Sequence, residues 1–165
     1  MAESFRTWLT RRGFNLFPAY RGTGGRVSYI ASDWREVRVR LPLNWRTRNY
    51  VGTTFGGSIY GAVDPFYMIM LIKLLGPGYV VWDKAATVRF KKPGRSTLYA
   101  RFTVSDEELA AIKGALAEGG SVDRVYQVDL TDREGVTHAI VEKTIYIRNL
   151  VGANNWDCSR LTSER

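Results

Sequence analysis

Six segments of the chain have the residue pattern of β-strands, and in most of them apolar and polar residues alternate. They are 26–31, 36–43, 79–91, 97–104, 122–131 and 136–148. Apolar residues at helical spacing predict a short helix over 3–13, which Gly13 would end, and an amphipathic helix after the capping residue Ser105. A third, long apolar helix is predicted to run from about Gly57 to Leu75 and to stop at Gly76.

This order of elements predicts an α+β fold in which an antiparallel sheet wraps around one long central helix. We expect a single domain over 1–148, with an N-terminal helix and loop over 1–25. The polar, aperiodic residues 149–165 are expected to form a disordered tail. Such a sheet leaves an edge strand that can pair with a second copy, so a symmetric dimer is expected.

Composition narrows the class of protein. With 165 residues and 45% hydrophobic residues, the chain can bury a core, which excludes a disordered protein. The lone Cys158 excludes an internal disulfide and a cysteine metal cluster, and it favours a reducing, cytoplasmic location. The first residues lack the apolar core of a signal peptide. Asp64 and Lys73 interrupt the longest apolar run, so neither a membrane span nor a membrane partner is expected.

The net charge of +8 is concentrated at the start of the chain. Residues 1–48 hold ten Arg but only Glu3, Asp33 and Glu36 as acids. These arginines could attract nucleic acid, acidic lipid or a phosphate-bearing substrate. Alternatively, they could simply lie on a solvated strand face and loop. Because no nucleic-acid-binding motif accompanies the charge, nucleic acid is an unlikely partner.

The run from Asn49 to Asp64 carries the candidate chemistry. A Gly56-Gly57 pair opens the long apolar helix, and the unpaired N–H groups of a helix N-terminus can stabilise a developing negative charge. Asp64 follows about two turns later and could act as base or nucleophile. Backbone donors and one carboxylate together suit acyl transfer.

The same run resembles the hotdog thioesterase superfamily. Many of its phenylacetyl-CoA-type members have an Asn, then HGGxxxxxxD, and Asn49, Gly56, Gly57 and Asp64 fall at those positions, with Phe55 in place of the histidine. A closer similarity is to a hotdog branch known as DUF4442, a domain of unknown function. It is carried by two stretches, FGGSIYGAVDPFYMIMLIKLLG and YVVWDKAATVRFKKPG.

The resemblance implies a hotdog fold and a homodimer or a dimer of dimers, with acyl-CoA or another thioester as substrate and neither a metal nor another cofactor. In this scheme the backbone N–H of Gly57 holds the thioester carbonyl oxygen, and Asp64 from the other subunit activates water or attacks directly. Asn49 would position the water or the loop. The substrate-contacting candidates are Thr53, Thr54, Phe55, Gly56, Tyr60, Trp82, Asp83 and Lys84.

Several of these residues have a purely structural alternative. Asp64-Pro65 would be a good N-cap if the helix began at Pro65, whereas a helix that begins at Gly57 would be kinked by Pro65. The two glycines could serve close helix–sheet packing. Thr53 and Thr54 could equally well satisfy their own loop.

Residues on the strands leave similar alternatives. Asp83 and Lys84 are adjacent, so they point to opposite faces, and the one that points inward must find a partner, most simply in an ion pair. Trp82 is expected in the core or along an acyl tunnel, as are Phe66 and Tyr67. The only histidine, His138, has no second His or Cys spaced to form a metal site or triad.

The sequence therefore predicts an acyl-CoA thioesterase with Asp64 and Gly57 at its centre. The alternative is a hotdog module that binds acyl groups or acyl-CoA without hydrolysis, which Phe55 in place of histidine favours.

Overall fold

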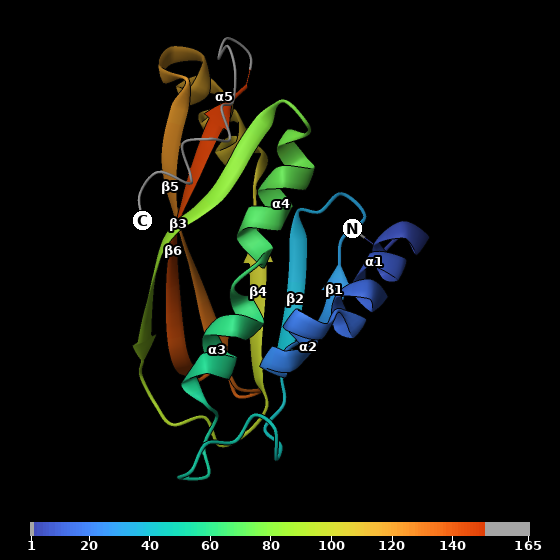
Figure 1. Ribbon diagram of the computed structural model, residues 1–165, viewed down its shortest axis with the longest axis vertical. Helices are drawn as coiled ribbons and strands as arrows, with labels where there is room; N and C mark the ends of the chain where they lie inside the picture. Colours follow the sequence, from blue (N-terminus) through green and yellow to red (C-terminus); the bar gives the residue numbers. More distant parts are fainter. Residues whose placement is uncertain (1, 151–165) are drawn as a thin grey trace, which may run out of the picture.

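A computed structural model describes residues 2–150 of the chain (Figure 1). Its helices are α1 (Phe5–Leu16), α2 (Pro18–Thr23), α3 (Gly56–Val63), α4 (Phe66–Leu75) and α5 (Asp106–Gly119). Its strands are β1 (Arg26–Ile30), β2 (Glu36–Leu41), β3 (Tyr79–Phe90), β4 (Leu98–Thr103), β5 (Ser121–Thr131) and β6 (Thr137–Asn149). The predicted strands are thus all present, with ends that differ by one or two residues.

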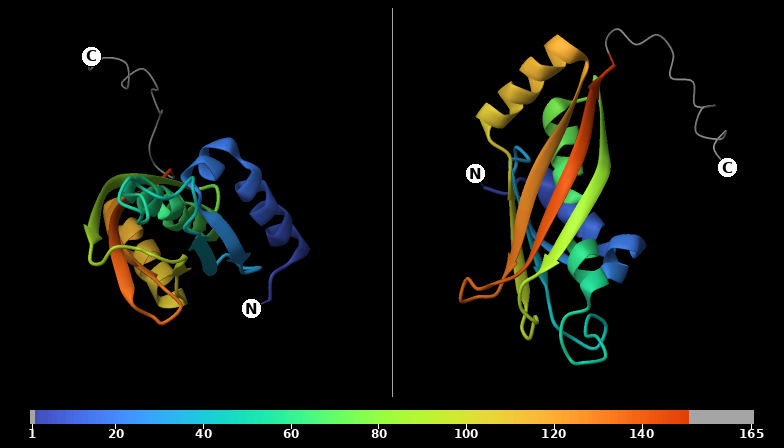
Figure 2. Two further views of the ribbon diagram at one scale, coloured as in Figure 1. Left: turned by 90° about the horizontal axis from the view of Figure 1, so that it is seen from below. Right: turned by 90° about the vertical axis from the view of Figure 1, so that its left-hand side faces the viewer.

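The six strands form one antiparallel sheet in the order β1-β2-β4-β5-β6-β3. The sheet curls around α3 and α4, as the end-on view in Figure 2 shows. The inward residues of each strand are apolar and buried, for example Val37, Val39 and Leu41 on β2. The predicted antiparallel sheet around a central helix is confirmed.

The central helix begins at Gly56, which agrees with the helix register starting at the glycine pair. It is not continuous, because Asp64 and Pro65 separate α3 from α4. Proline lacks the N–H that a helix interior needs and clashes with the preceding turn, which explains a break at this position. No side chain caps α4, so the alternative in which Asp64 caps a helix starting at Pro65 is wrong.

The core lies between this helix pair and the concave face of the sheet. Phe66, Tyr67, Met70 and Leu71 of α4 are buried, and the Phe66 and Phe102 ring centroids are 5.2 Å apart. By length and a mean hydropathy of 1.4, the segment Gly56–Leu75 passes as a membrane span. It packs against the concave face of the sheet, and 44% of that window is buried inside the domain.

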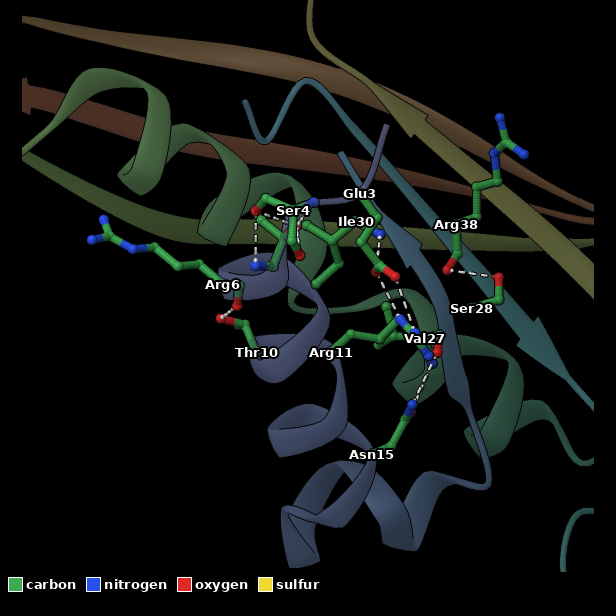
Figure 3. A network of polar contacts seen from close by, with 11 residues as sticks. Glu3, Ser4, Arg6, Thr10, Arg11, Asn15, Val27, Ser28, Ile30 and Arg38 are labelled. Carbon is green, nitrogen blue, oxygen red and sulfur yellow. Dashed lines mark hydrogen bonds and ion pairs between the residues drawn. The ribbon is translucent and has the colours of Figure 1, made fainter. Parts of the chain in front are cut away.

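Side chains from the N-terminal segment cover the outer edge of β1 (Figure 3). Asn15 exchanges two hydrogen bonds with the backbone of Val27, of 2.9 and 2.8 Å. Glu3 accepts the Ile30 N–H at 3.4 Å and is held in place by Arg11 at 2.8 Å. One edge of the sheet is therefore closed by the chain itself, whereas β3 lies at the other edge.

The N-terminal region differs from the sequence prediction. The first helix does not end at Gly13 but continues to Leu16, and it is followed by α2, which was not expected. Pro18 at the first position of α2 suits its start. At the other end, Asn149 still belongs to β6, and the predicted tail otherwise falls mostly on 151–165, outside the described residues.

Candidate active site

The start of α3 presents free backbone donors. Phe55 precedes the helix in an extended conformation and offers no side-chain cap, and the Ile59 N–H makes the first intrahelical bond, to the Phe55 carbonyl at 3.0 Å. The N–H groups of the first turn come before it and have no intrahelical acceptor. Gly57 is exposed there. Its N–H has no backbone acceptor among the described residues.

Aromatic rings lie close to both opening glycines of α3. A Cβ on Gly56 would lie 3.0 Å from the Phe90 ring of β3, and one on Gly57 would lie 2.5 Å from the Phe55 ring. The first contact supports the structural reading in which glycine permits close packing of the helix on the sheet. The second places an apolar ring, with no hydrogen-bonding capacity, beside the Gly57 donor.

The loop before α3 is held by its own polar groups. The Asn49 amide donates to the Thr53 hydroxyl at 2.9 Å and accepts the Thr53 N–H at 2.9 Å. The Thr54 hydroxyl donates to the Gly94 carbonyl at 3.2 Å. Asn49, Thr53 and Thr54 thus shape the loop that delivers Phe55 to the helix, and both threonines are buried.

The carboxylate of Asp64 is fixed at the break between α3 and α4. Lys143, which is only 1% exposed, donates from Nζ to Asp64 Oδ1 at 2.9 Å. The same ammonium donates to the backbone carbonyl of Asp64. A break in a helix leaves backbone groups unsatisfied, and Lys143 serves one of them. The Asp64 side chain itself remains 41% exposed, so it is both oriented and accessible.

Asp83 shares the same lysine. Asp83 lies two residues after the buried Val81 on β3, so by strand alternation its side chain also points inward, and its Oδ2 lies 2.8 Å from Lys143 Nζ. The other carboxylate oxygen, Oδ1, is buried and has no hydrogen-bond partner among the described residues. Two carboxylates therefore share one buried cation, and one oxygen atom remains free to accept a further proton donor.

Tyr60, one turn before Asp64, completes the cluster. The Lys143 Nζ lies 5.9 Å from the centre of the Tyr60 ring. Burial raises the pKa of the Tyr60 phenol, and a hydrogen bond to Asp64 together with the charges of Asp64 and Asp83 raises it further. The phenol therefore stays protonated at neutral pH and can donate to the carboxylate.

Trp82 and Lys84 lie away from this cluster. Lys84 pairs with Asp123 of β5 at 2.6 Å on the outer face of the sheet, which confirms that Asp83 and Lys84 point to opposite faces. Phe66 and Tyr67 are core residues as expected. The expected burial of Trp82 is wrong, because this side chain is 68% exposed.

His138 has a structural environment. Its ring nitrogens lie 2.9 Å from Asp132 Oδ2 and 3.1 Å from the Pro93 carbonyl oxygen. The hydrogen bond from His138 lowers the pKa of Asp132. Among residues 2–150, no group of three or more His, Cys, Asp or Glu is placed to hold a metal ion.

Comparison with known proteins identifies the family. The model of DUF4442, a domain of unknown function, matches residues 6–147. The chain belongs to the DUF4442 family. A search of curated proteins found no match for this DUF4442 chain.

Solved structures confirm the hotdog fold of this DUF4442 protein. A Pseudomonas aeruginosa protein of unknown function, described as a probable thioesterase, superposes with a TM-score of 0.76 at 18% identity, covering 90% of this chain and 99% of its own. A Haemophilus influenzae thioesterase superposes with a TM-score of 0.65 at 16% identity, covering 93% of this chain and 97% of its own. A Chlorobaculum tepidum protein of unknown function superposes with a TM-score of 0.67 at 16% identity, covering 86% of this chain and 93% of its own. The fold is thus that of thioesterase-like hotdog proteins.

Lys143 is a site residue that none of the motifs indicates. Its signal lies in the alternation of β6, where Val141, Lys143, Ile145 and Ile147 occupy successive inward positions. A lysine in such a series must be buried, and a buried lysine requires a carboxylate partner. Asp64 and Asp83 are those partners, which links three distant segments of the sequence.

Proposed function

We propose that the protein hydrolyses an acyl thioester of the acyl-CoA class, with Asp64 as general base or nucleophile, as a homodimer. The observation that carries this proposal is the Asp64 carboxylate, which is partly exposed and held by the buried Lys143. The hotdog fold shared with thioesterase-like proteins supports the substrate class.

In the base mechanism, Asp64 takes a proton from water while the water oxygen attacks the thioester carbonyl carbon. The negative charge that develops on the carbonyl oxygen is stabilised by the Gly57 N–H. The C–S bond then breaks, and the leaving thiolate takes the proton back from Asp64. The products are a carboxylic acid and a free thiol, and the enzyme is unchanged.

The donor and the base come from different subunits in this proposal. Gly57 and Asp64 of one chain are seven residues apart, about 10 Å along a helix, which is too far to meet at one carbonyl. An antiparallel approach of two copies would bring each Asp64 near the Gly57 of the partner subunit. The β3 edge supports this assembly, because Lys84–Thr87 of β3 are exposed on both faces.

The test is thiol release from a panel of acyl-CoA thioesters. We expect Asp64→Asn to lower kcat by about 100-fold or more, as losses of single catalytic groups commonly do. Glu118→Gln, which removes an exposed carboxylate from α5, is the control and should leave the rate unchanged. Equal rates for wild type and Asp64→Asn would exclude the role of Asp64.

A second function, acyl-CoA binding without hydrolysis, is supported by the Phe55 ring beside Gly57. This apolar ring replaces a hydrogen-bonding side chain at the start of the helix. Calorimetry distinguishes the two functions: saturable acyl-CoA binding with no thiol release, equally strong in wild type and Asp64→Asn, would establish the binding module. We also propose a cytoplasmic location, which the single cysteine supports.

A further inference from the structure

Helix α1 is anchored firmly to the domain by one of its faces. Arg11 and Asn15 point toward β1, as Figure 3 shows, and they bond Glu3 and the Val27 backbone. On the same side, Phe14 packs against Phe66 of the core, with 6.0 Å between ring centroids. The inner face of α1 is therefore fully used, and the orientation of its outer face is fixed.

The outer face of α1 carries a row of exposed apolar residues. Phe5, Leu9 and Leu16 are 76%, 57% and 68% exposed. Leu9 and Leu16 lie four and eleven residues after Phe5. In a helix with 3.6 residues per turn, these spacings place all three residues on one side. Phe17, directly after the helix, is 59% exposed. Single exposed apolar residues are ordinary, but such a row indicates an interaction surface.

A basic groove borders this apolar row. It has a volume of about 510 Å³ and lies between α1 and the outer side of β1 and β2. Its lining includes Arg11, Arg12, Arg26 and Arg40. Arg26 and Arg40 are direct cross-strand partners. Two like charges at such a position destabilise the strand pair unless an anion is present.

Three of these four arginines have no carboxylate partner among the described residues. Glu3 is paired with Arg11, and Glu36 is shared by Arg38 and Arg101. Within residues 2–150, Arg12, Arg26 and Arg40 have no carboxylate at ion-pair distance. The segment from Phe5 to Thr23 contains four arginines and no acidic residue. The groove is therefore a net cationic site.

We propose that the outer face of α1 and the adjoining arginine groove bind the surface of an anionic lipid bilayer. Phe5, Leu9 and Leu16 enter the boundary between headgroups and acyl chains, and lipid phosphates occupy the groove. An apolar helix face with basic residues beside it is the combination that interfacial helices use. The protein lies on the membrane and does not span it. The lipid-facing residues are separate from Asp64 and Lys143, so the proposal does not rest on the chemistry at Asp64.

The combination argues against two other occupants. Nucleic acid would neutralise the arginines, but it would leave the row of Phe5, Leu9 and Leu16 in water. A second copy meeting this face through a two-fold axis would bring its own arginines against these. Of these three occupants, an anionic lipid surface is the one that meets both the charge and the apolar row.

The test is co-sedimentation of the full-length protein with vesicles. We expect binding to an equal mixture of phosphatidylcholine and phosphatidylglycerol, weaker binding at high salt, and little binding to phosphatidylcholine alone. Arg12→Ala with Arg40→Ala should weaken binding about 25-fold, from about fivefold for each charge. Leu9→Ser with Leu16→Ser should weaken it more than about tenfold, through lost apolar burial.

Matched controls keep the result specific. Arg101→Ala removes a cationic side chain that is already paired with Glu36. Val125→Ser replaces an exposed apolar side chain on β5. Both should bind vesicles like wild type, and circular dichroism should show all variants folded.

Three results would overturn the proposal. One is wild-type protein that does not bind the anionic vesicles. Another is dissociation of an oligomer by Leu9→Ser with Leu16→Ser, which would assign the face to a second copy. The third is tight binding of a DNA or RNA oligonucleotide that the arginine variant loses, while the leucine variant binds vesicles like wild type.

Discussion

At the residue scale, Lys143 joins parts of the chain that lie far apart in sequence. It comes from β6 and contacts the carboxylates of Asp64, between two helices, and of Asp83, on β3. A buried ammonium is unfavourable unless carboxylates compensate it. The same ion pair that compensates the buried charge of Lys143 also fixes the orientation of the Asp64 carboxylate. Stability and candidate chemistry therefore depend on one side chain.

We predict that Lys143→Met lowers the free energy of unfolding by about 2–3 kcal/mol, because it leaves Asp83 partly buried without its cation. The loss stays below the upper range for buried pairs because both carboxylates keep some contact with water. Urea denaturation at neutral pH measures it.

Lys84→Met is the matched control for this change. Lys84 and Asp123 form an exposed ion pair, so its removal should change stability by less than about 1 kcal/mol. Equal effects of the two substitutions would show that the Lys143 cluster is no more important than a surface pair.

The site was predictable from the sequence only in part. The opposite orientations of Asp83 and Lys84 follow from strand alternation, and the helix start at Gly56 follows from the family register. The partner of Asp83 could not be read from its own neighbourhood, because Lys143 lies 60 residues away. Side chains that meet only through tertiary contact leave no local pattern.

At the element scale, Glu108 ties α5 to the sheet. It receives hydrogen bonds from Arg124 at 2.9 Å and from the Tyr126 phenol at 2.7 Å. Tyr126 in turn stacks on Tyr67 of the core, with 4.6 Å between ring centroids. The hydrogen bond from Arg124, followed by that from Tyr126, lowers the pKa of Glu108. The ionised carboxylate is thus the form that stabilises the fold.

We predict that Glu108→Gln lowers the free energy of unfolding by about 2 kcal/mol at pH 7, through lost charge-assisted hydrogen bonds. The pKa of Glu108 in the folded state lies below the ordinary value of 4.5. The extra unfolding free energy of the wild type over Glu108→Gln is therefore complete above about pH 4.5, and it is lost as the pH falls through the lowered pKa. Urea denaturation between pH 3 and 7 measures the difference. Glu118→Gln, on the exposed side of α5, is the control, and a pH-independent difference for Glu108→Gln would contradict the linkage.

Most elements could be predicted from the sequence, because amphipathic patterns are local. The stripe of Leu109, Ile112 and Leu116 on α5 is buried as its spacing implies. The end of α1 could not be predicted from Gly13, because its anchoring through Asn15 to Val27 is a tertiary contact. Tertiary contacts of this kind override a weak helix-ending signal.

At the scale of the whole molecule, the two sheet edges differ. The edge of β1 is satisfied by Asn15 and Glu3, whereas Lys84–Thr87 on the opposite edge strand are exposed. An edge strand with free backbone groups favours pairing with another strand. The proposed dimer therefore forms at β3.

We predict that Ala85→Arg, a large cation on this exposed strand, produces a folded monomer and lowers thioesterase activity by at least about tenfold, since each site loses the donor from the partner subunit. Light scattering and thiol release measure the two effects together. Val125→Arg on the interior strand β5 should keep the dimer. A fully active monomer would show that the site lies within one chain.

The closed edge of β1 has a consequence for how far assembly can proceed. When two copies join through β3, each end of the combined sheet is a β1 strand whose backbone is already occupied by its own N-terminal segment. No further chain can extend the sheet, so growth stops after one addition. In the proposed dimer the N-terminal segment would thereby block open-ended fibre formation, and its deletion would expose a second growing end.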